Sequence, residues 1–189
     1  MPEDIVLCDP GLMLSKLYSP TSSTKKHRIG LILHWQDKKL NLENNNGIHR
    51  ISILTDDIEN LADEIVSCDI ILSSSLHGII FAHSYGIPAY HVQFKDFFNN
   101  GNYKFNDYYS SFDGVEYRKF LAEFDEKSNC YRIPLQTILE CDMAYRDKLN
   151  PSVNQIYEKQ LQFLRVVPFK EVLNEKYKQK LYIGNRRIL

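Results

Sequence analysis

The chain has no long hydrophobic segment and no excess of charge of either sign. A helix that crosses a membrane needs about 20 consecutive apolar residues, and no run of apolar residues in this chain of 189 approaches that length. The N-terminus has no signal-peptide pattern. Its 23 Lys and Arg residues and 24 Asp and Glu residues give a formal charge of −1. We therefore expect no membrane span, and neither nucleic acid nor an anionic membrane surface is expected as a partner.

Paired cysteines are also absent. Cys8, Cys68, Cys130 and Cys141 are scattered along the chain and form no C-x-x-C motif. Two of them, at positions 8 and 68, fall at the ends of apolar strand-like runs, which favours buried free thiols over disulfides. Free thiols suit a reducing compartment, so we expect a cytoplasmic protein.

The composition is sufficient for a hydrophobic core. Apolar residues make up 43% of the chain and aromatic residues 12%. A chain of this length fits one domain, or one domain with a tail. We expect an α/β domain over residues 1–150, followed by a C-terminal helix and a basic tail over 151–189.

Short apolar runs alternate with helical patterns in the first half of the chain. The expected strands are residues 5–8, 28–35, 49–54, 69–73 and 89–92, and the expected helices between them are residues 12–17, 57–66 and 76–85. This alternation predicts a Rossmann-like parallel sheet with helices on both faces. Farther along, helices are expected over residues 116–124, 133–149 and 151–169.

The most informative segment is DIILSSSLHGIIFAHSYGIPAY, residues 69–90. It predicts a buried strand, a serine turn that can cap a helix, and His77 in the first turn of that helix. Backbone N–H groups are unpaired at such a helix start and the helix dipole is positive there. The turn is therefore suited to an anion, beside a titratable imidazole.

Within this segment, SSLHGIIFAHSYGIP resembles the signature of the polysaccharide pyruvyl transferase family. That signature is a hydrophobic strand, S-x-[RS]-L-H-G, an apolar helix and G-x-P. Two further pieces are similar and follow the same order: Asp9-Pro10-Gly11-Leu12, and the K-F-x-D-Y-Y-x-S pattern over residues 104–111. The resemblance covers about residues 5–112 and marks this chain as similar to the carboxyl-terminal half of a member.

The resemblance implies a domain like the carboxyl-terminal domain of a GT-B fold. It also implies transfer of a pyruvyl group from phosphoenolpyruvate to a saccharide, in cell-surface or exopolysaccharide biosynthesis. Such a reaction needs a general acid that protonates the methylene carbon of phosphoenolpyruvate, and His77 is the catalytic candidate. No cofactor and no metal site are expected.

The substrate-binding candidates are groups that we expect at the same edge of the sheet or in the segment after the histidine helix. They are Ser73, Ser74, Ser75, Gly78, Asp9, Lys104, Asp107 and Tyr108. Serine hydroxyls can donate to phosphate, although capping is the alternative. Lys and Asp can hydrogen-bond hydroxyls or phosphate, and a tyrosine ring can stack on a sugar or pack on the core. His34 and Trp35 are expected at this edge, and Arg28 and His49 at the opposite edge.

Two features separate this chain from a typical whole member. Ser75 stands where many members carry an arginine, which would bind an anion, and a whole member would have another Rossmann-like domain ahead of this one. Two alternatives stay open: a sugar-nucleotide glycosyltransferase of GT-B type, and a catalytically silent binding or assembly module.

The apparent half length also predicts weak activity alone and an exposed apolar face. Through that face the chain would form a homodimer or bind the missing N-terminal domain. The residues expected there are Phe94, Phe97, Phe98, Tyr108 and Tyr109, with the helix from Pro151.

Overall fold

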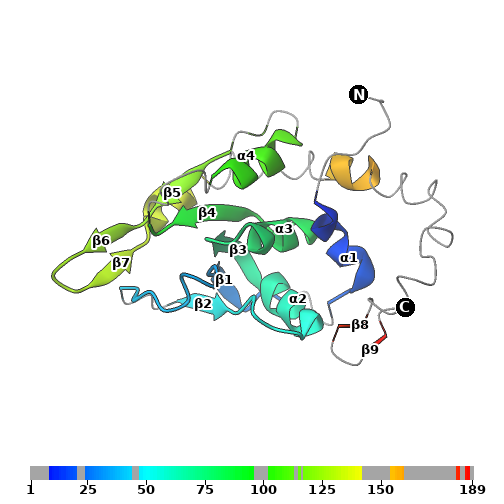
Figure 1. Ribbon diagram of the computed structural model, residues 1–189, viewed down its shortest axis with the longest axis horizontal. Helices are drawn as coiled ribbons and strands as arrows, with labels where there is room; N and C mark the ends of the chain where they lie inside the picture. The colour runs from blue at the N-terminus through cyan, green and yellow to red at the C-terminus, as the bar shows by residue number, and fades with distance from the viewer. Residues whose placement is uncertain are drawn as a thin grey trace.

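The centre of the molecule is a five-stranded parallel sheet with the strand order β2-β1-β3-β4-β5 (Figure 1). The computed structural model describes residues 9–20, 24–43, 47–95, 102–112, 115, 117–141, 154–159, 182–183 and 186–187. The strands are β1 (His27–Ile32), β2 (Ile48–Ile51), β3 (Cys68–Ser73), β4 (Ala89–Gln93) and β5 (Lys119–Leu121). Helices surround the sheet, which confirms the expected Rossmann-like α/β class.

The helices gather around α3 (Leu76–Ser84), which follows β3 directly (Figure 1). This helix contacts α1 (Leu14–Leu17), α2 (Ile58–Val66) and the short 3-10 helix η1 (Pro10–Met13), as well as β3 and β4. On its other side α3 meets α4 (Tyr103–Ser110) through a hydrogen bond between His83 and Tyr108. The histidine helix is therefore the element on which the described helices converge.

Local sequence accounts for the start of α2. The Asp57 side chain accepts a hydrogen bond from the Asn60 backbone N–H at 3.0 Å, as an N-cap carboxylate does. Leu61, Ala62 and Ile65 then form the buried stripe of the helix.

The end of α3 also follows from the sequence. Gly86 has a φ of +67°, the left-handed conformation in which glycine carries no steric penalty. The Gly86 N–H donates to the His83 carbonyl, and the Ile87 N–H donates to the Ala82 carbonyl at 2.9 Å. This pair of bonds is a Schellman motif, which turns the chain toward β4.

The middle of the sheet is packed closely around a glycine in β1. A Cβ atom at Gly30 would lie 2.6 Å from Ile71 Cδ1, 2.8 Å from Cys68 Sγ and 3.0 Å from Ile51 Cδ1. Side chains from the two neighbouring strands therefore occupy the space that a methyl group at this position would need. Cys68 and Cys130 are buried free thiols, as expected, and Cys141 is partly buried. Cys8 lies outside the described residues.

The expected helix over residues 116–124 is wrong. Lys119–Leu121 forms β5, in register with His91, Val92 and Gln93 of β4. Pairing with the otherwise open edge of β4 outweighs the modest helix propensity of this segment, because tertiary context overrides such preferences. The next residues form a hairpin of β6 (Glu123–Asp125) and β7 (Cys130–Arg132).

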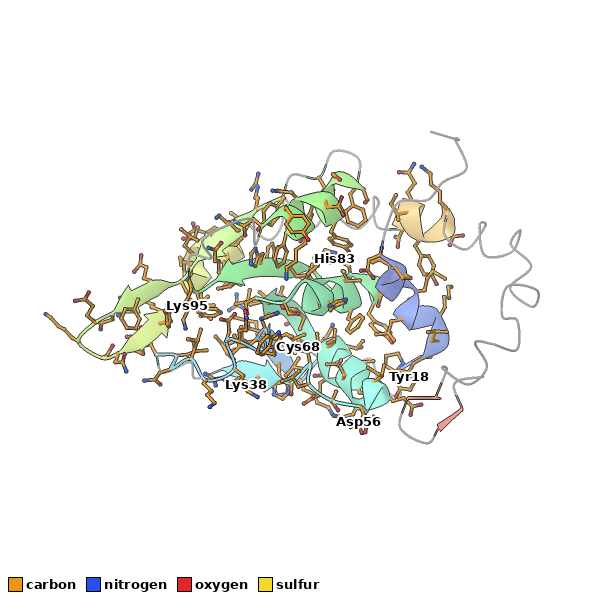
Figure 2. All side chains as sticks on the ribbon, viewed as in Figure 1. Tyr18, Lys38, Asp56, Cys68, His83 and Lys95 are labelled. Atoms are coloured by element: carbon orange, nitrogen blue, oxygen red, sulfur yellow. The ribbon has the colours of Figure 1, made fainter. Side chains whose placement is uncertain are left out.

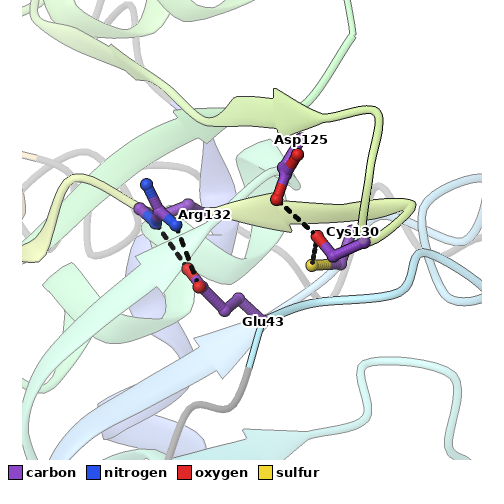
Figure 3. Close-up of polar contacts among 5 residues, drawn as sticks. Glu43, Asp125, Cys130 and Arg132 are labelled. Atoms are coloured by element: carbon purple, nitrogen blue, oxygen red, sulfur yellow. Dashed lines mark hydrogen bonds and ion pairs between the residues drawn. The ribbon is translucent and has the colours of Figure 1, made fainter.

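This hairpin is joined to the segment that follows β1. The Arg132 guanidinium donates to both carboxylate oxygens of Glu43, at 2.5 and 2.9 Å (Figure 3). Within the hairpin, the Ser128 hydroxyl lies 2.8 Å from both Asp125 and Cys130. The bidentate pair is exposed to solvent, so its role is to position the hairpin more than to stabilise the fold.

The remaining elements compare with the expectations as follows. The expected strand over residues 5–8 lies outside the described residues, and the strand expected over 28–35 ends early at Ile32. Residues 135–141 and 154–159 are helical, within the helices expected over 133–149 and 151–169. Two short strands, β8 (Tyr182–Ile183) and β9 (Arg186–Arg187), pair near the end of the chain. The proposed domain boundary at residue 150 is not described and stays a prediction.

The expected exposed apolar face is wrong where the structure describes it. Phe94, Tyr108 and Tyr109 have exposed fractions of 5%, 4% and 2%, and they pack in the core of the chain itself. Phe97 and Phe98 lie outside the described residues. Among the described helices, none is both long enough and apolar enough to cross a membrane.

Two histidines lie inside this core. His83, labelled in Figure 2, lies on α3 inside this core. It contacts the rings of Tyr108, Tyr109 and Phe112, and its Nε2 has no hydrogen-bond partner among the described residues. His91 of β4 stacks on Phe105, with ring centroids 3.8 Å apart. Its Nδ1 lies 2.6 Å from the hydroxyl of Tyr117. Burial lowers the pKa of each histidine to about 3, and nearby lysines add to the shift of His91.

These shifts predict that acid destabilises the protein. In the unfolded chain a histidine titrates near 6.5, so between pH 6.5 and 3 the unfolded state binds more protons than the folded state. Stability is complete above that window and is lost as the pH falls through it. We expect the free energy of unfolding to fall by about 2 kcal/mol per buried histidine between pH 7 and pH 5.

Urea denaturation at several pH values measures this loss. The variant His83→Gln keeps a polar contact for Tyr108 and removes one of the two buried histidines. Its free energy of unfolding should therefore fall by about half as much between pH 7 and pH 5. His77→Gln, at an exposed position, is the matched control and should keep the full dependence. An unchanged pH dependence in His83→Gln would show that His83 is not held neutral by the fold.

Candidate functional site

The turn between β3 and α3 is held by the hydroxyl of Ser73. This hydroxyl accepts a hydrogen bond from the Ser75 N–H at 3.0 Å, and its proton faces the carbonyls of Ile32, at 2.9 Å, and Ser75, at 2.8 Å. Ser73 is completely buried. In the structure it joins the end of β1 to the turn, one step ahead of the N-cap residue Ser75.

Ser74 ties the same two segments together. Its N–H donates to the Ile32 carbonyl at 3.1 Å, and its Oγ accepts from the His34 N–H at 2.9 Å. Ser75 is the N-cap of α3, although its side chain makes no capping hydrogen bond. The serines thus fix the turn, and the hydroxyls of Ser73 and Ser74 are both engaged by the protein.

The donors that stay open are in the first turn of α3. Within the described part of the chain, no hydrogen bond is formed by the backbone N–H of Leu76, His77 or Gly78, as is usual at a helix start. The His77 side chain is exposed, and its ring lies 6.0 Å from that of Phe81, one turn along the helix. An anion at this end would meet three N–H donors, the positive end of the helix dipole and an imidazole.

Gly78 has a reason in packing. A Cβ atom at this position would lie 2.5 Å from Ser73 Oγ and 2.8 Å from Ile32 Cγ2. Gly78 was a substrate-binding candidate in the sequence. In the structure, the group that approaches its backbone is the protein's own turn. Close approach of α3 to β1 and β3 is what gives the helix its position.

Asp9 lies beside α3, in the cap of η1. Its Oδ1 accepts a hydrogen bond from the Gly11 N–H at 2.7 Å. A Cβ at Gly11 would approach Phe81 Cε1 to 3.2 Å, so η1 rests against the residue that also contacts His77. The strand expected before Asp9 lies outside the described residues.

The charge of Lys104 reaches the end of β1. Burial lowers the pKa of His34, the Lys104 ammonium lowers it further, and the Asp37 carboxylate opposes the shift. His34 is the residue whose N–H is bound by Ser74. The charge of Lys104, from the downstream motif, therefore acts on a residue that follows β1 at the carboxyl edge of the sheet.

The other two residues of the downstream motif have different places. Asp107 is exposed on α4. Tyr108, with an exposed fraction of 4%, packs against His83 and bonds it through its hydroxyl at 2.9 Å. Core packing, the alternative weighed for the tyrosines, thus describes Tyr108 in this structure, and a sugar-binding role for it has no support in its geometry.

The opposite edge of the sheet carries its own cluster. His27 and His49 stack with ring centroids 4.0 Å apart, and His49 Nε2 lies 3.3 Å from the Glu64 carboxylate. Their positions near the starts of β1 and β2 place them away from the α3 turn, as expected for the amino ends of parallel strands. No group of three or more metal-ligating side chains is suited to a metal ion in the part of the chain that the structure describes.

The analysis of the sequence missed Asp37 and the cluster around His91. Asp37 follows Trp35 by two residues and has an exposed fraction of 3%. His91 lies among Phe105, Tyr117 and the charge of Lys119. Asp37 could have been noticed from its place beside Trp35. Nothing in the pattern of β4 indicates that His91 is buried among aromatic rings.

Comparison with known proteins identifies part of the chain. A family model described as "Polysaccharide pyruvyl transferase" matches residues 4–95, which confirms the resemblance noted in the sequence. The match includes Asp9 and the whole β3–α3 segment and ends before Lys104. A curated relative, "Uncharacterized protein L143" from Acanthamoeba polyphaga mimivirus, is 38% identical over 126 residues. No solved structure matches the chain.

The aligned region is 61% of this chain and 44% of that relative. The chain thus spans less than half the length of the curated relative that it matches. Likeness to a GT-B domain stays a prediction.

The contacts of Gly78 predict that an alanine here is not tolerated. The added methyl group would overlap Ser73 Oγ and Ile32 Cγ2, and overpacking of this kind costs about 1–3 kcal/mol. Helix propensity alone would favour alanine, so a loss of stability separates packing from propensity. Chemical denaturation of Gly78→Ala measures the effect. His77→Ala, the adjacent exposed position, is the control and should stay within about 0.5 kcal/mol of the parent.

Proposed function

We propose that this chain, whose residues 4–95 belong to the polysaccharide pyruvyl transferase family, carries the donor side of a pyruvyl transferase site. The observation that carries the proposal is the exposed His77 in the first turn of α3, beside backbone N–H groups without partners in the described part of the chain. Both features lie in the segment that the family model covers. The acceptor in this proposal is a saccharide.

Phosphoenolpyruvate is the donor that suits this site best. Its phosphate and carboxylate are anions, which the N-terminus of α3 and the charge of Lys104 favour. Lys104 lowers the pKa of His34, so its positive charge acts at the end of β1, which Ser74 holds beside the α3 turn.

His77 acts as general acid in the proposed reaction. It gives a proton to the methylene carbon of phosphoenolpyruvate, which leaves a cation at the adjacent carbon. A saccharide hydroxyl adds to that carbon and releases its proton, and phosphate leaves as its C–O bond breaks. A second hydroxyl of the saccharide then adds at the same carbon and releases its proton, which closes the cyclic ketal.

A second polypeptide segment completes the site in this proposal. The chain aligns with only 44% of its curated relative, and two-domain enzymes of this kind bind their two substrates between the domains. We therefore expect little transferase activity from the chain alone. Burial of Phe94, Tyr108 and Tyr109 removes the argument for a homodimer through those rings, so the partner proposed is a segment equivalent to the part of the relative that the alignment leaves out, referred to as the missing half.

The cellular setting remains a prediction of the same proposal. Phosphoenolpyruvate is an intracellular metabolite, and the buried thiols of Cys68 and Cys130 suit a reducing compartment. We propose that the step takes place in the cytoplasm, before export of an exopolysaccharide or another cell-surface saccharide.

Binding of the donor can be tested on the chain alone. Phosphoenolpyruvate added to ¹⁵N-labelled protein should shift the backbone amide signals of Leu76, His77 and Gly78, because these N–H groups face the anion. Inorganic phosphate should give smaller shifts of the same signals. If a UDP-sugar shifts them and phosphoenolpyruvate does not, the glycosyltransferase alternative is correct. No shift with either anion favours the silent module.

Catalysis requires the complete enzyme. With the missing half supplied, either as a separate chain or in a full-length relative, His77→Ala should lower kcat by about 100-fold, as loss of a general acid does. His83→Gln, which changes a buried histidine on the same helix, should keep kcat near that of the parent. Release of phosphate from phosphoenolpyruvate in the presence of a saccharide measures both rates, and an unchanged rate in His77→Ala removes it from the mechanism.

A further inference from the structure

The loop that follows β1 carries a second group of functional side chains. We propose that this loop, residues 34–37, is the saccharide-binding subsite that adjoins His77, an inference that rests on the proposed function. In it the Trp35 ring stacks on the apolar face of a hexopyranose, and the Asp37 carboxylate accepts hydrogen bonds from its hydroxyls.

Trp35 is the largest exposed side chain beside the α3 turn. Its exposed fraction is 55%, and it is the single tryptophan of the chain. One exposed aromatic ring is common on protein surfaces and carries no argument alone. The argument comes from where this ring is held and from what lies beside it.

Hydrogen bonds fix the loop against the α3 turn. The His34 N–H donates to Ser74 Oγ at 2.9 Å, and the Ser74 N–H donates to the Ile32 carbonyl at 3.1 Å. The Asp37 N–H then donates to the His34 carbonyl at 2.8 Å, which closes a tight turn around Trp35. The backbone that carries the indole is therefore held against Ser74, which lies three residues before His77 in the chain.

Asp37 supplies a second observation that points to a ligand. Its exposed fraction is 3%, and within the described part of the chain its carboxylate makes no hydrogen bond. Its oxygens are not among the fully buried atoms that lack a partner, so they reach the surface, where a carboxylate accepts hydrogen bonds from a ligand. Its charge affects His34, whose ring lies 5.6 Å from that of Trp35, so the acid and the indole belong to one cluster. The labelled Lys38 marks the position of this loop in Figure 2.

The pairing of an aromatic face with a carboxylate fits a saccharide better than an anionic ligand. A hexopyranose presents C–H groups on its faces, which pack on an indole, and hydroxyl donors on its rim, which suit a carboxylate. A phosphate would be repelled by Asp37. The anionic donor is thus directed to the start of α3, and the neutral acceptor to Trp35 and Asp37 in the loop that Ser74 holds.

The fluorescence of the single tryptophan tests this subsite directly. Methyl β-galactopyranoside, methyl β-glucopyranoside and methyl α-mannopyranoside are titrated into the full chain, with tryptophan emission and calorimetry recorded in parallel. We expect at least one glycoside to change the emission with the same midpoint as the heat of binding. The experiment needs neither phosphoenolpyruvate nor the missing half.

Variants define the contribution of each side chain. Trp35→Ala should weaken glycoside binding, measured by calorimetry, about tenfold, whereas Trp35→Phe should weaken it less than threefold because a ring remains. Asp37→Asn, of the same size, should weaken it about tenfold through loss of the charged acceptor. Phe124→Leu is the matched control, because Phe124 is an exposed ring, 49% exposed, on the β6–β7 hairpin outside the proposed subsite, and should have no effect.

Two results overturn the inference. One is glycoside binding that leaves tryptophan emission unchanged and is unaffected in Trp35→Ala, which places the saccharide elsewhere. The other is the absence of binding for all three glycosides at tens of millimolar. In either case the proposed function is judged separately, by the response of the Leu76, His77 and Gly78 amides to phosphoenolpyruvate.

Discussion

The hydroxyl of Ser73 is the contact on which the candidate site depends. It joins the last residue of β1 to the first residues of the α3 turn, and it lies where only a glycine at position 78 leaves room. Replacement of the hydroxyl by an apolar group would leave the Ser75 N–H without its acceptor in a buried place. The position of His77 at the surface therefore depends on the Ser73 hydroxyl, which is completely buried.

This view changes what the serine-rich turn means. The triple serine suggested a row of hydroxyl donors for phosphate, but two of the three hydroxyls hold β1 to the turn. In the proposed site, anion recognition then depends on backbone N–H groups, whose positions are fixed by the helix and which side-chain substitution does not remove. A site of this kind depends less on an arginine at position 75 than a site built from side chains alone.

The sequence predicted the parts of the fold in which local pattern and tertiary context agree. The β3–α3 unit and the helix expected from residue 57 each have a chemical signature within a few residues. The β5 strand does not, because it forms only where the edge of β4 is offered to it. In the site, His77 and its turn were found from the motif, and the pattern of α4 could not show that Tyr108 faces His83. The spacing of apolar residues along one helix shows which face is buried, but it does not show which residue of another element that face contacts.

The glycine in β1 has a consequence for how this sequence can vary among its relatives. A methyl group at position 30 needs space that Ile51, Ile71 and the Cys68 sulfur already fill. An alanine therefore requires the ends of those side chains to shift or to become shorter, and a shorter side chain without the alanine leaves a cavity. Position 30 and its three neighbours thus form one packing unit, in which a change at one residue is best accommodated by a matching change at another.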